Sequence, residues 1–209
     1  MPPDRTEPSP DRQTDALASG LRKTIAIVAL ANLAYFFIEF AVARYIGSVS
    51  LFADSVDFLE DAAVNSLILM ALGWSLAARA RVGMAMAGVL LLPALAFLWT
   101  LWNKFQAPVP PEPCLLSASG LGALAVNLAC ARALARFRHH SGSLTKAAFL
   151  SARNDALANV AIVGAGVLTL FWPSHWPDVV VGLGIAFMNA DAAREVWEAA
   201  RQEQAEASA

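Results

Sequence analysis

The chain has 209 residues, of which 57% are hydrophobic and only 15% are charged. This composition is typical of a membrane protein rather than a soluble one, because the few charges leave long apolar runs between them. The formal net charge of −2 gives no basis for binding nucleic acid. Two cysteines, Cys114 and Cys130, would lie about 24 Å apart on one helix, which excludes a disulfide between them.

Six apolar segments fill the chain between two polar ends, and no stretch remains for a soluble domain. Residues 1–18 are polar and contain four prolines, which predicts a disordered tail. Residues 19–199 form the predicted six-helix membrane domain, and residues 200–209 form a short second tail. We therefore expect an all-α membrane protein with six transmembrane helices. In chain order, the predicted spans are residues 21–46, 49–76, 82–105, 114–134, 144–172 and 178–197.

The placement of lysine and arginine predicts the orientation of these spans. Twelve of the fifteen basic residues fall in, or at the boundaries of, the two tails and the loops after the second and fourth spans. The opposite side carries only Arg44 and Lys104, while Arg153 lies inside a span. Because basic loops stay on the cytoplasmic side, both termini are predicted to be cytoplasmic.

The second predicted span contains four carboxylates within eight residues, from Asp54 to Asp61. On a helix, Asp54, Asp57 and Asp61 fall within about 60° of one another and form one acidic stripe. Glu60 lies beside the stripe rather than on it. Carboxylates are expensive in hydrocarbon, so such residues face a bundle interior and usually serve an ion or proton pathway.

The second and fifth spans share a local pattern, D-A-x-x-N, at residues 61–65 and 155–159. One turn upstream of each aspartate stand Asp57 and Ser151. The first and fourth spans also share a central asparagine, Asn32 and Asn127. With three spans in each half, matching helices run in opposite directions, as in the inverted repeats of secondary transporters. The match is short, and chance is the alternative explanation.

The two matching turns could form one metal site. Asp57 and Asp61 share one helix face, as do Ser151 and Asp155, so four oxygen-bearing side chains could surround a cation. Three carboxylates around a divalent cation leave about one negative charge, which favours binding without trapping the ion. Without metal, three close carboxylates cannot all stay ionised, so protons compete for the site. This competition predicts metal–proton exchange, with no resident cofactor.

At residues 47–61 and 148–155 the chain resembles the cation diffusion facilitator family. Asn32 and Glu39 in the first span also fit that family's pattern. The resemblance implies six spans, cytoplasmic termini and a metal site in the middle of the membrane, built from an H/D-x-x-x-D pair on each of the second and fifth helices. It implies export of a divalent metal across the cell (inner) membrane. Zinc is the family default, while cadmium, manganese and iron stay open.

The chain departs from the family pattern in two ways that bear on function. Ser151 stands where the family has histidine or aspartate, which makes the site richer in oxygen and leaves zinc selectivity open. The chain is also expected to be a short member without the family's cytoplasmic C-terminal domain. A homodimer, if formed, would then be held by its membrane helices.

Three further residues are candidates for an accessory or pathway role. Asp54 is either a vestibule residue or an ordinary charge near a helix end. Glu39 belongs either to a proton route or to helix packing. Asn154 is a weaker oxygen donor than Ser151, because its side chain would point about 60° away from the side predicted to face the site.

Other polar residues have simpler interpretations than metal binding. Glu60 is expected to pair with a positive group, for which Arg153 is the candidate. His139 and His140 end a helix, where histidine is favoured without any metal. We expect interhelical hydrogen bonds rather than metal ligation from Asn65 and Asn159.

Two other classes of function compete with transport. A membrane interaction protein could bind metal without moving it, and the missing histidine would suit that role. An intramembrane aspartyl protease also places aspartates on two helices. The sequence around Asp61 and Asp155 resembles neither the Tyr-Asp nor the Gly-x-Gly-Asp motif of such proteases.

Overall fold

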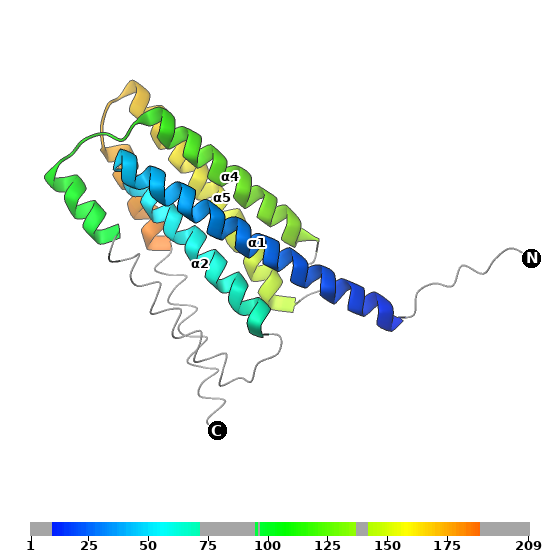
Figure 1. Ribbon diagram of the computed structural model, residues 1–209. Helices are drawn as coiled ribbons and strands as arrows, with labels where there is room; N and C mark the ends of the chain where they lie inside the picture. Colours follow the sequence, from blue (N-terminus) through cyan, green and yellow to red (C-terminus); the bar gives the residue numbers. More distant parts are fainter. Residues whose placement is uncertain (1–9, 72–94, 96, 137–141, 189–209) are drawn as a thin grey trace, which may run out of the picture.

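The computed structural model describes residues 10–71, 95, 97–136 and 142–188 of the chain (Figure 1). These residues form four long helices and two shorter helical segments, at residues 97–106 and at Trp176–Met188, with no strand among them. The all-helical prediction is therefore confirmed for the part that is described. The long helices are α1 (Pro10–Ile46), α2 (Val49–Ala71), α4 (Pro113–Ala135) and α5 (Gly142–Phe171).

Three of the described helices contain stretches long and apolar enough to cross a membrane: Ser19–Ile46, Pro113–Ala135 and Asn154–Phe171. Helix α2 is long enough at 23 residues but contains four carboxylates. The apolar helix Trp176–Met188 is shorter. The predicted spans 82–105 and 178–197 lie partly outside the described residues, as do His139 and His140.

Helix α1 begins at Pro10, inside the segment that the sequence analysis expects to be disordered. Proline suits the first turn of a helix. It lacks a backbone N–H, but an N–H in that turn would have no partner within the helix. Arg12, Gln13, Ala16 and Leu17 are good helix formers, so a helix already nucleated in the apolar part can extend through them. Residues 1–9 lie outside the described part of the chain.

A glycine turn joins α1 to α2. Gly47 has a φ of 62°, in the left-handed region that glycine adopts without strain. The Ser48 amide donates to the Ala43 carbonyl (3.0 Å), which closes α1 in the manner of a Schellman motif. Ser48 then caps α2, because its Oγ accepts from the Leu51 amide (3.1 Å).

Helix α4 also has a defined start. The exposed Glu112 carboxylate accepts from the amides of Cys114 (3.1 Å) and Leu115 (2.5 Å), and Pro113 follows it at the first helical position. These amide donors hold the pKa of Glu112 below its ordinary value. The helix therefore begins abruptly after the proline-rich loop.

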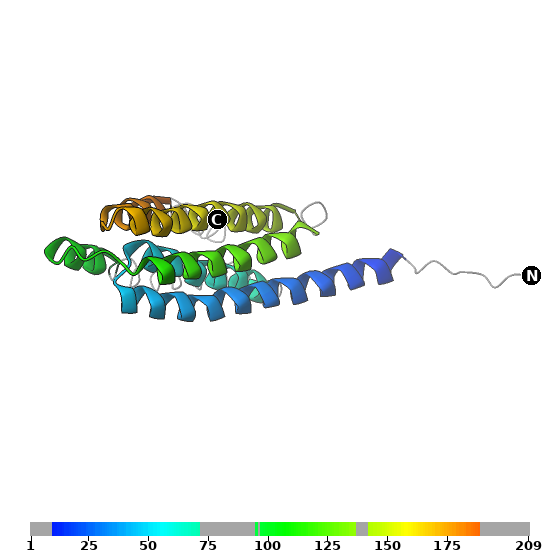
Figure 2. The ribbon, with the colours of Figure 1, turned by 90° about the horizontal axis from the view of Figure 1, so that it is seen from above.

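The four long helices form a bundle in which α1 packs on α2 and α4 packs on α5. Contacts of α1 with α4 and of α2 with α5 join the two pairs. Figure 2 shows α1 on one side of the bundle and α5, with the helix Trp176–Met188, on the other. Helix α2 thus has neighbours that can meet its acidic face.

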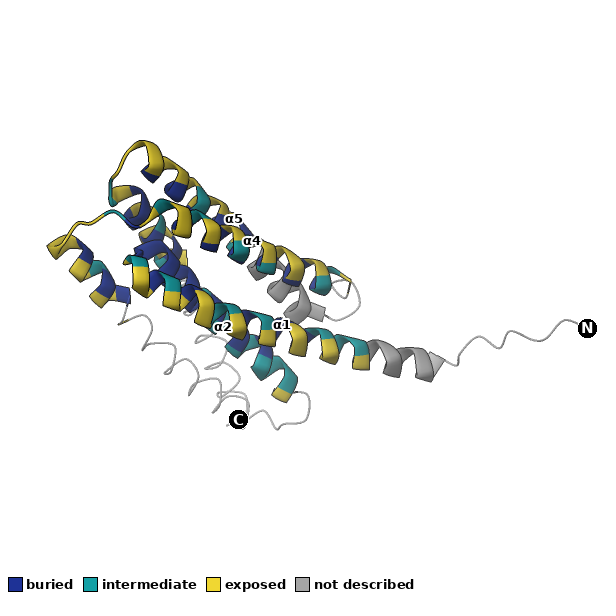
Figure 3. Cartoon of the chain, turned by 45° about the horizontal axis from the view of Figure 1, so that its top comes forward, coloured by how far each residue is buried: buried dark blue, intermediate teal, exposed yellow. Residues whose placement is uncertain are grey.

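The outer surface of the bundle is more apolar than that of a soluble protein. Figure 3 shows many exposed residues along the outward faces of α1, α4 and α5. Among them are large apolar side chains such as Phe37, Leu121 and Leu157. Polar side chains are instead buried between the helices: Asn32, Glu39, Asp54, Asn127 and Asn159. An apolar outer surface, with the polar side chains kept between the helices, is what a bundle in lipid requires.

Candidate metal site between α2 and α5

The acidic stripe of α2 faces the bundle, as its spacing predicts. Asp54 is fully buried, while Asp57 and Asp61 are half-buried. Glu60 is also half-buried and interacts electrostatically with Asp57 and Asp155, so it lies near the stripe rather than away from it. The side chain of Arg153, its expected partner, lies outside the described residues.

Helix α5 brings Asp155 to this stripe. Asp155 is half-buried, interacts electrostatically with Asp57 and Asp61, and is close enough to Asp61 to share a side-chain hydrogen bond. Its Oδ2 atom is buried and has no hydrogen-bond partner. The structure thus gathers the three aspartates that the sequence analysis selects, although their role as ligands stays a prediction.

The remaining two α5 candidates are not placed in the site. Ser151 lies on α5 one turn before Asp155, but its side chain is outside the described residues. Asn154 is exposed, so the structure does not bring its amide to the three aspartates. A fourth protein ligand from Ser151 therefore stays a prediction.

Helix α1 supplies the side chains that line the stripe from the opposite direction. The Asn32 amide donates to Asp61 Oδ2 (3.3 Å) and orients that carboxylate. The Tyr35 ring packs on Phe58, with centroids 5.0 Å apart. Glu39 is fully buried, and neither of its carboxylate oxygens has a hydrogen-bond partner. Both first-span polar residues in the family pattern therefore face the acidic helix.

A chain of amides joins α4, α5 and α2. Asn127 Nδ2 donates to Asn159 Oδ1 (2.9 Å), and Asn159 Nδ2 donates to Asp54 Oδ2 (2.5 Å). The predicted interhelical role of Asn159 is confirmed. Asn65 differs, because its amide donates to the Asp61 carbonyl of its own helix (2.8 Å). That bond to the preceding turn is available to any asparagine on a helix and needs no neighbour.

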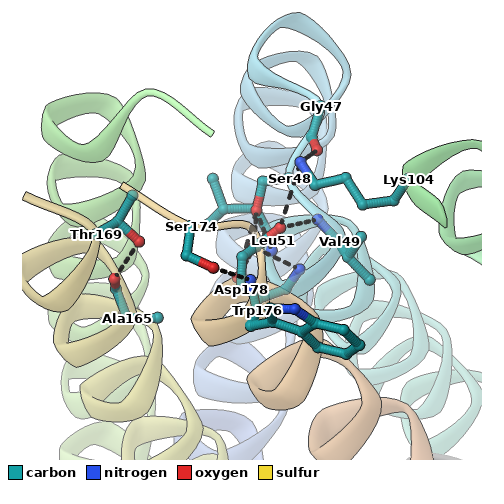
Figure 4. Close-up of polar contacts among 11 residues, drawn as sticks. Gly47, Ser48, Val49, Leu51, Lys104, Ala165, Thr169, Ser174, Trp176 and Asp178 are labelled. Carbon is teal, nitrogen blue, oxygen red and sulfur yellow. Dashed lines mark hydrogen bonds and ion pairs between the residues drawn. The ribbon is translucent and has the colours of Figure 1, made fainter. Parts of the chain in front are cut away.

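Sequence reasoning missed a polar cluster at the first turn of α2 (Figure 4). The buried Asp178, at the start of Trp176–Met188, accepts from the hydroxyls of Ser48 and Ser50, both at 2.6 Å. It also accepts from the amides of Val49 (2.8 Å) and Ser50 (3.0 Å). A carboxylate from another helix thus satisfies the free amides of this helix end.

Lys104 completes this cluster. Its Nζ donates to the Gly47 carbonyl (2.6 Å) and lies 3.9 Å from Asp178 Oδ2. The only signals in the sequence were a lone lysine and a lone aspartate at the ends of predicted spans. Their 74-residue separation gives no hint of contact, so tertiary packing alone brings them together.

Within the described residues, no three histidine, cysteine, aspartate or glutamate side chains converge closely enough to hold a metal ion. Mutual repulsion keeps neighbouring carboxylates apart unless a cation or proton lies between them. Asp57, Asp61 and Asp155 are therefore neighbours whose geometry would need to tighten around a cation.

The family model of the cation efflux transmembrane domain matches residues 25–202. The chain belongs to the cation efflux family. A search of curated proteins finds no match. This cation efflux protein is thus a multi-pass membrane protein of a family of metal cation transporters rather than of enzymes, which rules out the aspartyl protease alternative.

Proposed function

We propose that this cation efflux protein exports a divalent metal from the cytoplasm in exchange for protons, with zinc as the first candidate. One observation carries the proposal: Asp57 and Asp61 of α2 and Asp155 of α5 interact within the bundle rather than facing lipid. Intramembrane carboxylates that face one another mark ion pathways. Manganese and iron are further candidates, because the proposed ligands are all oxygen atoms, and cadmium stays open.

The charges of the site explain why protons would be the counter-ion. A divalent cation among three carboxylates leaves about one negative charge, whereas the empty site would carry about three in a poorly solvated space. Protons relieve that repulsion when the metal leaves. The hydrogen-bonding proximity of Asp155 and Asp61 supports this view, because two carboxyl groups can share a hydrogen bond only when a proton lies between them.

The described packing supports the six-span arrangement with an inverted repeat. Asn159 contacts Asp54, while Asp155, earlier on α5, contacts Asp61, later on α2. The two helices therefore run in opposite directions, as matching helices of an inverted repeat must. We further propose cytoplasmic termini, residence in the cell (inner) membrane, and a homodimer held by membrane helices.

Zinc uptake into proteoliposomes tests the proposal. Wild-type protein should move zinc at a rate that rises with an opposing proton gradient. Asp155→Ala should abolish transport, because it removes one of three charges that hold the cation, while membrane insertion stays intact. Normal transport by Asp155→Ala would show that the site is wrong, and indifference to the proton gradient would remove the exchange mechanism.

A matched control uses a carboxylate outside the site. Glu112→Gln removes an exposed charge at the start of α4 but keeps an oxygen that can cap the helix. Its transport rate should equal that of the wild type. Metal binding without uptake in the wild type would instead identify a membrane interaction protein.

A further inference from the structure

Glu39 and Asp54 are buried carboxylates that the proposed exchange site does not use. Each has a relative exposure of 0%. Both carboxylate oxygens of Glu39 and Oδ1 of Asp54 are buried without a hydrogen-bond partner. Three unpartnered carboxylate oxygens at one place inside a membrane bundle are costly unless a cation or a proton binds there.

The register of α1 against α2 brings these two side chains together. Asn32 bonds to Asp61 and Tyr35 packs on Phe58. The two helices are therefore antiparallel, and moving along α1 by a number of residues corresponds to moving back along α2 by the same number. Glu39 is seven residues beyond Asn32, and Asp54 is seven residues before Asp61. The carboxyl groups of Glu39 and Asp54 accordingly approach within hydrogen-bonding range, although neither carboxylate is a donor.

Tyr35 and Asn159, two donors near this pair, are already engaged. The Tyr35 hydroxyl donates to the Ser119 carbonyl (2.7 Å). Asn159 donates to Asp54 Oδ2, and its own oxygen accepts from Asn127. Asp54 is therefore held through Oδ2, while its Oδ1 has no hydrogen-bond partner. The buried Lys104 is also engaged, because it donates to the Gly47 carbonyl and lies beside Asp178.

We propose that Glu39 and Asp54 form a second divalent-cation site, built from oxygen ligands alone and distinct from Asp57, Asp61 and Asp155. Two carboxylates neutralise one divalent cation, which suits a site with no solvent to screen a residual charge. The amide of Asn159 orients the Asp54 carboxylate for this role. This proposal rests on the proposed export function and adds a second binding site to the transport pathway.

The position of the pair suggests what the second site does. Asp54 is one turn nearer the start of α2 than Asp57, about 4.5 Å along the helix axis. In the proposed orientation that end of α2 faces away from the cytoplasm. A cation leaving Asp57 would thus meet Glu39 and Asp54 next. Two carboxylates would hold a divalent cation less tightly than the three carboxylates of the first site, because they carry less negative charge.

Equilibrium dialysis of the full chain in detergent against radioactive zinc tests this site. The background variant Asp57→Asn with Asp155→Asn removes two ligands of the first site. It should still bind a single zinc ion through oxygen ligands, with zinc X-ray absorption reporting no sulfur or imidazole. Adding Glu39→Gln should weaken that binding by at least about tenfold. Adding Glu112→Gln instead should leave it unchanged.

Several outcomes separate this proposal from the export function. If the wild type binds and transports zinc but the background variant binds none, the pair holds a proton instead and the second site is wrong. Unchanged zinc binding after Glu39→Gln would overturn it equally. Wild-type protein that neither binds nor transports zinc would contradict the export function itself. Should Glu39→Gln fail to elute as a folded species, Glu39→Asp, which keeps the charge but shortens the side chain, should still weaken binding.

Discussion

Two carboxylates in this bundle, Asp61 and Asp54, are oriented by amide partners from neighbouring helices. Asn32 bonds to one oxygen of Asp61, and Asn159 bonds to one oxygen of Asp54. In lipid an amide that loses its partner has no water to replace it. The asparagines therefore act as positioning residues for the acidic helix.

At the residue scale, Asn159→Ala should destabilise the protein by about 1–2 kcal/mol, because it leaves Asp54 Oδ2 and the Asn127 amide without partners. Thermal unfolding in detergent measures this, and zinc transport should fall as well. Thr169→Val is the control on the same helix, since Thr169 bonds only to Ala165 of its own helix (2.7 Å). Equal losses in the two variants would argue against the amide chain.

The second residue-scale prediction concerns metal choice. Ser151→His should raise the rate of zinc transport relative to manganese, because imidazole is a good zinc ligand and a poor one for harder cations. Competition between the two metals in proteoliposomes measures the ratio. An unchanged ratio would mean that Ser151 is not a ligand.

Among the elements, the start of α2 is held by contacts with a neighbouring helix. Asp178 satisfies its first amides from a neighbouring helix, and Gly182 lets that helix approach. A Cβ atom on Gly182 would lie 2.9 Å from the Ser50 amide nitrogen and from Val49 Cγ1. Close approach of this kind is how small residues serve membrane helix contacts.

We therefore expect Gly182→Ala to lower the melting temperature, with a loss of about 1–3 kcal/mol from overpacking against the α2 backbone. Gly184→Ala is the matched control, because a Cβ there meets nothing within 4 Å. It should be neutral or slightly stabilising, since alanine favours a helix more than glycine does. Equal melting temperatures for both variants would mean that the two helices do not meet as described.

For the whole molecule, native cysteines report the orientation. Cys114 is exposed at the start of α4, and Cys130 is buried. With cytoplasmic termini, Cys114 faces outward, so a membrane-impermeant maleimide should label intact cells, and Cys114→Ser should remove the label. Labelling only after permeabilisation would place the start of α4 in the cytoplasm and reverse the proposed topology.

Much of this molecule could be predicted from the sequence because membrane burial leaves strong local signals. The length of the apolar segments predicted the long helices. The spacing of Asp54, Asp57 and Asp61 predicted the acidic face of α2. The repeated D-A-x-x-N pattern pointed to Asp155 on α5. In lipid any carboxylate within a span stands out against its neighbours, so its position alone indicates its side of the helix.

Contacts between distant segments were decided only by the tertiary structure. Nothing local links Lys104 or Ser48 to Asp178, and nothing in the first span alone places Glu39 against Asp54. The antiparallel register of α1 on α2 and the approach at Gly182 make these pairs, because packing sets which turns of two helices meet. The spacing of residues in the sequence thus identified the acidic residues, whereas the packing of the helices determined which residues contact them.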